Sequence, residues 1–150
     1  DLSLRPNQIF AVSLPNSPLP RTQQSQVLAA VGHQLLTPYG LRTLPPGDAK
    51  YHGRYAGPQY QRDEAYHQGT IWPWLIGPYA EAVLRVGDFS DKAKQEALAA
   101  LQPLVDDLLG RGLGQLHEIH EADPPHRPVG CIAQAWSVAE VLRVWKMCGE

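Results

Sequence analysis

Apolar residues recur at helical spacing in four stretches of the sequence, and this periodicity limits the folds available to the chain. The stripes run through residues 27–36, 72–84, 98–109 and 135–145. Apolar residues three and four positions apart share one face of a helix, so each stripe predicts a helix that packs against others. Residues 8–14 are also apolar, in a pattern that suits a short helix or a strand. Convincing alternation of apolar and polar residues is missing elsewhere, and we therefore predict an all-α fold.

Residues that start and stop helices flank two of these stripes. Thr70 is a residue type suited to cap the second helix. Pro73 would then lie in the first helical turn, where proline is tolerated. Ser90 can cap the third helix, and the glycines at positions 110 and 112 can end it. These signals give the expected helix boundaries.

Two long connections separate the predicted helices. Residues 37–65 are rich in Pro, Gly and Tyr and have no clear period. Connections of this length inside a compact domain are usually functional or disordered, and the tyrosines at 39, 51, 55 and 60 favour an ordered, packed one. Residues 113–130 form the second connection. It holds His117, Glu118, His120, Glu121, Asp123 and His126.

Length and charge narrow the class of protein. With 150 residues the chain fits one domain, residues 1–150. It starts at Asp1 and enters an apolar stretch almost at once, so we expect the C-terminal part of a longer chain. The net charge of -2 and the pI near 6.3 argue against nucleic acid or an anionic membrane as partner. No apolar run approaches the ~20 residues of a membrane span. Cys131 and Cys148 are expected as reduced thiols in a cytoplasmic protein.

The densest group of aromatic and polar side chains is the segment YHQGTIWPW, residues 66–74. A sugar presents C–H groups to aromatic rings and hydroxyl groups to planar polar partners, and this segment offers both. The alternative is structural: Trp72 and Trp74 would be core residues, and His67 would make a local cap.

Carboxylates in the two long connections are candidates for catalysis, because glycoside hydrolysis needs two of them beside the scissile bond. Glu118 lies between Leu116 and Ile119, so it is the one expected to be held against packed structure. The alternative for any such residue is an ordinary surface charge. We predict that the others are solvated, namely Glu121, Asp123, Asp63 and Glu64.

A metal site is the competing interpretation of residues 113–130. His117 and His120, with nearby acids, His126 and Cys131, could supply zinc ligands. Their spacing differs from the helical His-Glu-x-x-His pattern, and Pro124-Pro125 excludes a helix here. No metal or other cofactor is therefore predicted. A nucleophilic serine is disfavoured too, since the sequence has no G-x-S-x-G motif.

Four segments together resemble the C-terminal glucosidase region of glycogen debranching enzymes, the amylo-α-1,6-glucosidase family of six-hairpin glycosidases. They occur in family order over nearly the whole chain: RPNQ (5–8), LTPYGLRTL (36–44), YHQGTIWPW (66–74) and QAWS (134–137). The resemblance implies an (α/α)6 toroid of paired helices, of which this chain would hold the last part. It also implies an inverting mechanism whose general acid lies upstream.

The resemblance also assigns roles to residues. The family's general base lies in a Glu-apolar motif before a Pro-rich turn, and here that motif contains Glu118. The residues that would line or adjoin the glucose pocket are Tyr66, His67, Gln68, Trp72, Arg5, Asn7, Gln134 and Trp136. For Trp136, sugar contact and core packing both stay open.

The expected activity is removal of α-1,6-linked glucose from the branch points of glycogen or a related α-glucan. One alternative is another hydrolase on the same toroid, of the glucoamylase, trehalase or α-glucosidase kind. A second is a non-catalytic α-glucan-binding module. The expected partners are the α-glucan and the upstream part of the same domain. Because a partial ring exposes apolar helix faces, the isolated piece is also expected to self-associate and to lack catalysis.

Overall fold

The computed structural model describes residues 2–149, which are mostly helical and include a small antiparallel sheet. The helices are α1 (Phe10–Ser13), α2 (Arg21–Gln34), α3 (Gln59–Ala65), α4 (Ile76–Val86), α5 (Asp91–Gly110) and α6 (Ala135–Met147), with 3-10 turns at Pro6–Ile9 and Pro73–Leu75. The strands are β1 (Leu36–Thr37), β2 (Gly40–Arg42), β3 (Ile71–Trp72), β4 (Ile119–His120) and β5 (Pro128–Val129).

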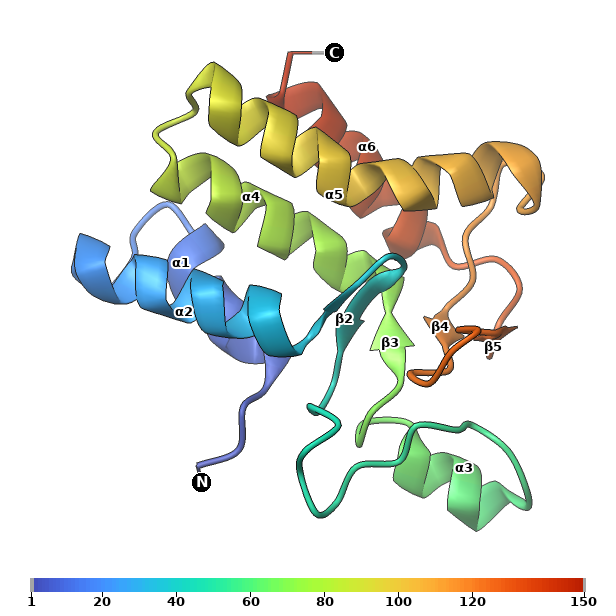
Figure 1. Cartoon of the computed structure of the whole chain (residues 1–150). Coiled ribbons are helices and arrows are strands. Elements are labelled where there is room, and N and C mark those ends of the chain that lie inside the picture. Colours follow the sequence, from blue (N-terminus) through green and yellow to red (C-terminus); the bar gives the residue numbers. More distant parts are fainter. Residues whose placement is uncertain (1, 150) are drawn as a thin grey trace.

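Helix α4 is the central element of the helical part. Figure 1 shows it between α2 and α5. Eight of its eleven residues are buried, as expected for a helix that is covered on most sides. Ile76 and Leu84 pack with Leu101 of α5 and Val141 of α6. A second apolar cluster lies between α4, α1, α2 and the sheet, and it contains Ala82, Val12, Val31 and Ile119.

Three of the four predicted helices are confirmed. Helices α2, α5 and α6 follow the stripes, although α2 ends two residues before its stripe does. The Ser90 hydroxyl oxygen accepts a hydrogen bond from the Ala93 amide at 3.4 Å, so Ser90 caps α5 as expected. Helix α5 ends at Gly110, also as expected. Residues 6–13 are helical rather than extended.

The predicted start of the helix after residue 70 is wrong. Helix α4 begins at Ile76, and Thr70 caps nothing there. Instead, the Thr70 hydroxyl donates to the carbonyl oxygen of Tyr66 at 2.6 Å. Ile71 and Trp72 are strand residues, and Pro73 opens a 3-10 turn. The first residue of the apolar stripe, Trp72, therefore pairs in the sheet instead of starting the helix.

The prediction of an all-α fold is wrong in one respect, because the two long connections contribute strands to a sheet. The strand order is β1-β2-β3-β4-β5, and every neighbouring pair is antiparallel. Leu41 pairs with Trp72, and Ile71 pairs with His120. Strands of two or three residues are too short to show an alternating pattern, and the partners of β3 lie far away in the sequence. This sheet joins the segments that carry the candidate site residues.

The connection from residue 37 to residue 65 is ordered, as predicted. It contains β2 and α3, and its Leu41 and Leu44 are fully buried. Figure 1 shows α3 at the outer edge, beyond the sheet. Asp63 and Glu64 are exposed there, which confirms the prediction that they are solvated, although they lie on a helix rather than in a loop.

Two further properties concern the chain as a whole. Among residues 2–149, no helix is both long enough and apolar enough to span a bilayer. Cys131 is exposed and Cys148 is buried, and neither forms a disulfide.

Candidate active site

Glu118 lies just before β4, in a segment whose backbone is fixed on both sides. Leu116 and Ile119 are fully buried, so the expectation that packed structure holds Glu118 is confirmed. The Glu118 amide donates to the Cys131 carbonyl oxygen at 2.9 Å, which extends the pairing of β4 with β5. The Glu118 side chain is half-buried and reaches Tyr66.

Three donors orient the Glu118 carboxylate. The Tyr66 hydroxyl donates to Oε1 at 2.6 Å, and the Gln134 amide group donates to the same oxygen at 3.4 Å. The backbone N–H of Cys131 donates to Oε2 at 3.1 Å. Hydrogen bonds to an ionised acceptor are stronger than neutral ones, so they hold this carboxylate in one orientation. The sequence could not reveal the Cys131 donor, since every non-proline residue has such a group.

Tyr66 is held in its protonated form. Burial raises the pKa of the Tyr66 hydroxyl well above its usual range, and the hydrogen bond to Glu118 and the negative charge of that carboxylate raise it further. A phenol that keeps its proton donates to Glu118 throughout the physiological pH range.

Gly130 packs directly against the carboxylate. Its φ of 71° lies in the left-handed region that glycine adopts without strain. A Cβ atom placed there would lie 2.6 Å from Oε2 of Glu118. Glycine therefore fits this position without strain, whereas a larger residue would press on the Glu118 carboxylate.

Aromatic rings form a continuous wall beside Glu118. The Tyr66 ring meets the Trp72 ring edge to face at a centroid distance of 4.8 Å, and His67 stacks on Trp72 at 5.3 Å. Trp136 lies 6.0 Å from Trp72 and stacks on Trp74 at 5.1 Å. The structural alternative holds in part, because Trp72 is buried while His67 is exposed.

A cavity of about 200 Å³ opens against this wall. It is lined by Pro6, Asn7, Phe10, Thr43, His67, Trp72, Trp74, Leu75 and Trp136. Trp136 is 45% exposed, so core packing does not account for it. Phe10 and Trp74 were not predicted as pocket residues. Trp74 belongs to the aromatic segment 66–74, which indicated a sugar site, whereas no sequence motif marked Phe10 as a pocket residue.

Arg5 and Gln68 face each other and brace the site. The Arg5 guanidinium donates to Gln68 Oε1 at 2.8 Å and to the carbonyl oxygens of His67 and Thr43 at 2.6 and 2.9 Å. These bonds join the N-terminal segment to the aromatic one. The structure thus brings all nine predicted site residues into one connected group.

The zinc interpretation finds no support in the geometry of residues 2–149, where no three His, Cys, Asp or Glu side chains converge as metal ligands. His120 is fully buried, and its Nδ1 lies 3.1 Å from the carbonyl oxygen of His126. Burial lowers the pKa of His120 to about 4, so the ring is neutral at physiological pH.

The prediction that Glu121 is solvated is wrong. Its side chain is 1% exposed and forms ion pairs with Arg54 and Arg127. Asp123 is 43% exposed but accepts a hydrogen bond from Tyr51 at 2.9 Å, so it too is engaged. The sequence showed only a polar, proline-flanked turn, because one of the two arginines that pair with Glu121, Arg54, comes from another segment.

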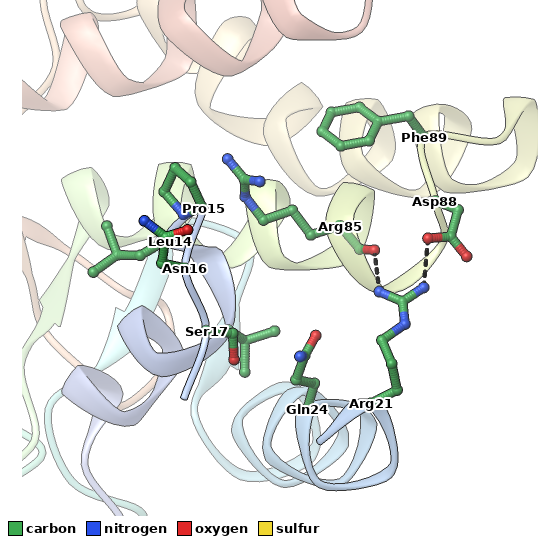
Figure 2. A pocket seen from close by; sticks show the side chains of 10 residues that line it. Leu14, Pro15, Asn16, Ser17, Arg21, Gln24, Arg85, Asp88 and Phe89 are labelled. Atoms are coloured by element: carbon green, nitrogen blue, oxygen red, sulfur yellow. Dashed lines mark hydrogen bonds and ion pairs between the residues drawn. The ribbon is translucent and has the colours of Figure 1, made fainter. Parts of the chain in front are cut away.

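A larger cavity, of about 560 Å³, lies at the other end of α4, and Figure 2 shows it from close by. Arg21 spans one side of it and donates to Asp88 at 2.5 Å and to the carbonyl oxygen of Arg85 at 2.7 Å. None of the nine predicted site residues lines this cavity. The polar groups around Glu118 are therefore gathered elsewhere.

The sequence is similar to a known protein family and to a known enzyme. Residues 1–143 match the family described as amylo-alpha-1,6-glucosidase. The chain is also 31% identical over 88 residues to the glycogen debranching enzyme of Saccharomyces cerevisiae. That match covers 55% of this chain and 6% of the yeast protein, so the chain corresponds to a small part of that relative. Because the family match covers nearly the whole chain, this chain belongs to the amylo-alpha-1,6-glucosidase family.

Proposed function

We propose that the protein to which this chain belongs removes α-1,6-linked glucose from branch points of glycogen or a related α-glucan. One observation carries the proposal: in a member of this family, the oriented carboxylate at position 118 is hydrogen-bonded to Tyr66, whose ring packs on Trp72 in the wall of an aromatic-lined cavity. Sugar sites combine aromatic faces with a few convergent polar groups, and this cavity has both.

In the proposed mechanism Glu118 is the general base of an inverting hydrolysis. Its carboxylate takes a proton from a water molecule, and the oxygen of that water forms a bond to the anomeric carbon. The bond from that carbon to the leaving oxygen breaks, and a general acid protonates this oxygen. Attack from the opposite face converts the α-linkage into β-glucose. The acid would come from the upstream part of the same catalytic domain.

The other predicted residues would hold the sugar or support the site. Trp136, which is 45% exposed, would offer a ring face to the C–H groups of glucose, with the buried Trp72 in the wall beside it. Asn7 and His67 would offer polar groups at the cavity. Gln134, which donates to Glu118, would also contact a sugar hydroxyl. Arg5 and Gln68 would support the site rather than contact the sugar, because Arg5 donates a hydrogen bond to Gln68.

This proposal places residues 1–150 in the last part of an (α/α)6 toroid in a cytoplasmic enzyme. The upstream helices would then cover apolar side chains that are exposed here, such as Leu142 of α6. The isolated chain would lack turnover, and it would associate with itself through such surfaces.

The test is product release by the intact protein from defined α-1,6- and α-1,4-linked glucose oligosaccharides. The expected result is glucose from the α-1,6-linked branch alone, appearing first as the β-anomer in proton NMR spectra. Release from α-1,4 linkages alone would favour a glucoamylase-like enzyme, and first appearance of the α-anomer would contradict inversion. Glucan binding without any release would identify a binding module instead.

A further inference from the structure

Glu121 is a buried charge in the strand region, three residues beyond Glu118. Its Oε1 pairs with Arg127 at 3.0 Å, and its Oε2 pairs with Arg54 at 3.1 Å. The two arginines come from different segments, one after β2 and one just before β5. A buried carboxylate is costly unless it is paired, and the two arginines supply that pairing. The chain therefore keeps a charge here at some energetic expense.

The pair with Arg127 closes one end of the β4–β5 hairpin. The Glu121 amide also donates to the Arg127 carbonyl oxygen at 2.9 Å. At the opposite end of the same hairpin, the backbone of Glu118 pairs with Cys131, and the Cys131 amide binds the Glu118 carboxylate. A shift of one residue in the pairing of two strands would turn every side chain to the other face. The Glu121–Arg127 pair thus helps to fix the register that aligns Glu118.

The pair with Arg54 fastens this hairpin to the connection that follows β2. Arg54 also donates to the Pro124 carbonyl oxygen at 3.1 Å. Beside it, the Asp123 amide donates to the Gly53 carbonyl oxygen at 3.1 Å. Glu121 is the buried centre of this attachment, because its carboxylate alone binds both arginines.

From these contacts we infer that Glu121 is a positioning residue for catalysis: its ion pairs with Arg54 and Arg127 hold the hairpin that aims the Glu118 carboxylate. The inference rests on the proposed function for its kinetic consequence, but not for its structural one. Displacing a catalytic group by about 1 Å can lower turnover by about 10²-fold, so loose attachment of the hairpin lowers kcat.

The chain contains a matched control in Glu81 of α4. Its Oε1 pairs with Arg85 and its Oε2 pairs with Arg143, both at 2.6 Å, and it too is buried. Both glutamates are therefore buried carboxylates bracketed by two arginines. Glu81 lies in the helical part, and its ion-pair partners are not residues of the candidate site. Its substitution therefore measures the effect of losing two buried ion pairs when the alignment of Glu118 is not affected.

The experiment compares Glu121→Gln, Glu121→Asp and Glu81→Gln in the intact protein. Arg54 and Arg127 are 56% and 61% exposed, so water can solvate them when the carboxylate is removed and the variant can fold. Steady-state kinetics on an α-1,6-linked substrate gives kcat and KM separately. Hydrogen exchange gives the protection of the amides of Glu118 and Cys131 independently of activity.

For Glu121→Gln we expect kcat to fall at least 10-fold with KM changed less than twofold, and the two amides to exchange at least 10-fold faster. Glu121→Asp keeps the charge and should recover part of both losses. Glu81→Gln should lower the melting temperature by a similar amount while leaving kcat and these amides unchanged. Equal loss of kcat in both Gln variants, or unchanged exchange in Glu121→Gln, would overturn the inference. If the wild-type protein releases no glucose, the proposed function fails, and the exchange data alone still decide whether Glu121 holds the hairpin.

Discussion

The helical part of the molecule and the strand region around Glu118 are held together by different interactions. Helices α4, α5 and α6 enclose a cluster of aliphatic side chains that includes Leu84, Leu101 and Val144. The strand region shares the second apolar cluster, but it also has hydrogen bonds between polar groups far apart in sequence, such as Tyr66 to Glu118 and Arg5 to Gln68. Apolar packing is non-directional, whereas hydrogen bonds fix orientation. We conclude that the first region provides stability and the second provides alignment.

The largest effect on stability is expected in the helical part. Leu101 is fully buried in the α4–α5–α6 cluster, so Leu101→Ala removes apolar contacts and leaves a cavity. We expect the free energy of unfolding to fall by about 2 to 5 kcal/mol, measured by urea denaturation of the 150-residue chain. In the intact protein, below its melting transition, kcat should stay within twofold of the wild-type value. A large loss of kcat in the folded variant would break the division between the two regions.

The buried His120 in the strand region makes stability depend on pH. Its pKa is about 4 in the folded chain and near 6.5 when unfolded, so between these values the unfolded chain binds more protons. Stability is therefore full above pH 6.5 and falls as the pH is lowered towards 4, by up to ~3 kcal/mol. His120→Asn keeps a donor near the His126 carbonyl oxygen and should remove most of this dependence.

Denaturation curves at several pH values between 7 and 4 measure this effect. His33→Asn, at an exposed position on α2, controls for the loss of a histidine as such. If His120→Asn has the same pH dependence as the wild-type chain, His120 does not carry the effect.

Gly130→Ala should have a modest effect on stability and a larger one on activity. A side chain at φ 71° costs about 1 to 2 kcal/mol, and its Cβ would press on the Glu118 carboxylate. We expect kcat of the intact protein to fall about 10-fold or more, because displacing a catalytic group slows the chemical step. Gly114→Ala, at φ 83° where a Cβ meets nothing within 4 Å, is the matched control. If Gly130→Ala turns over at the wild-type rate, Gly130 is not needed to align Glu118.

The same contrast explains what the sequence could and could not predict. Helices α5 and α6 were predictable because their determinants are local: an apolar stripe and, for α5, the Ser90 cap one turn away. The sheet was not predictable, because Ile71 becomes a strand residue through pairing with Arg42 and His120, which are distant in sequence. Trp72 fits the helical spacing of the apolar residues that follow it, so the sequence predicted a helix where the structure has a strand.

The candidate site shows the same limit. The side chains at positions 66, 67, 72 and 118 were recognised through motifs, and the structure brings them together. What surrounds them was missed, because it depends on backbone conformation and on distant partners. Gly130 acts through its φ angle, and Glu121 is buried by an arginine 67 residues away. Neither property is written in the neighbouring residues.

The most direct test is the substitution Glu118→Gln in the intact protein, with kcat measured on an α-1,6-linked substrate and sugar affinity measured separately. If this carboxylate activates the attacking water, kcat falls by ~10² to 10⁴ while affinity changes little, since an amide keeps the shape but cannot take the proton. Glu64→Gln, at an exposed site on α3, should leave both quantities unchanged. Near-normal turnover in Glu118→Gln would contradict the account.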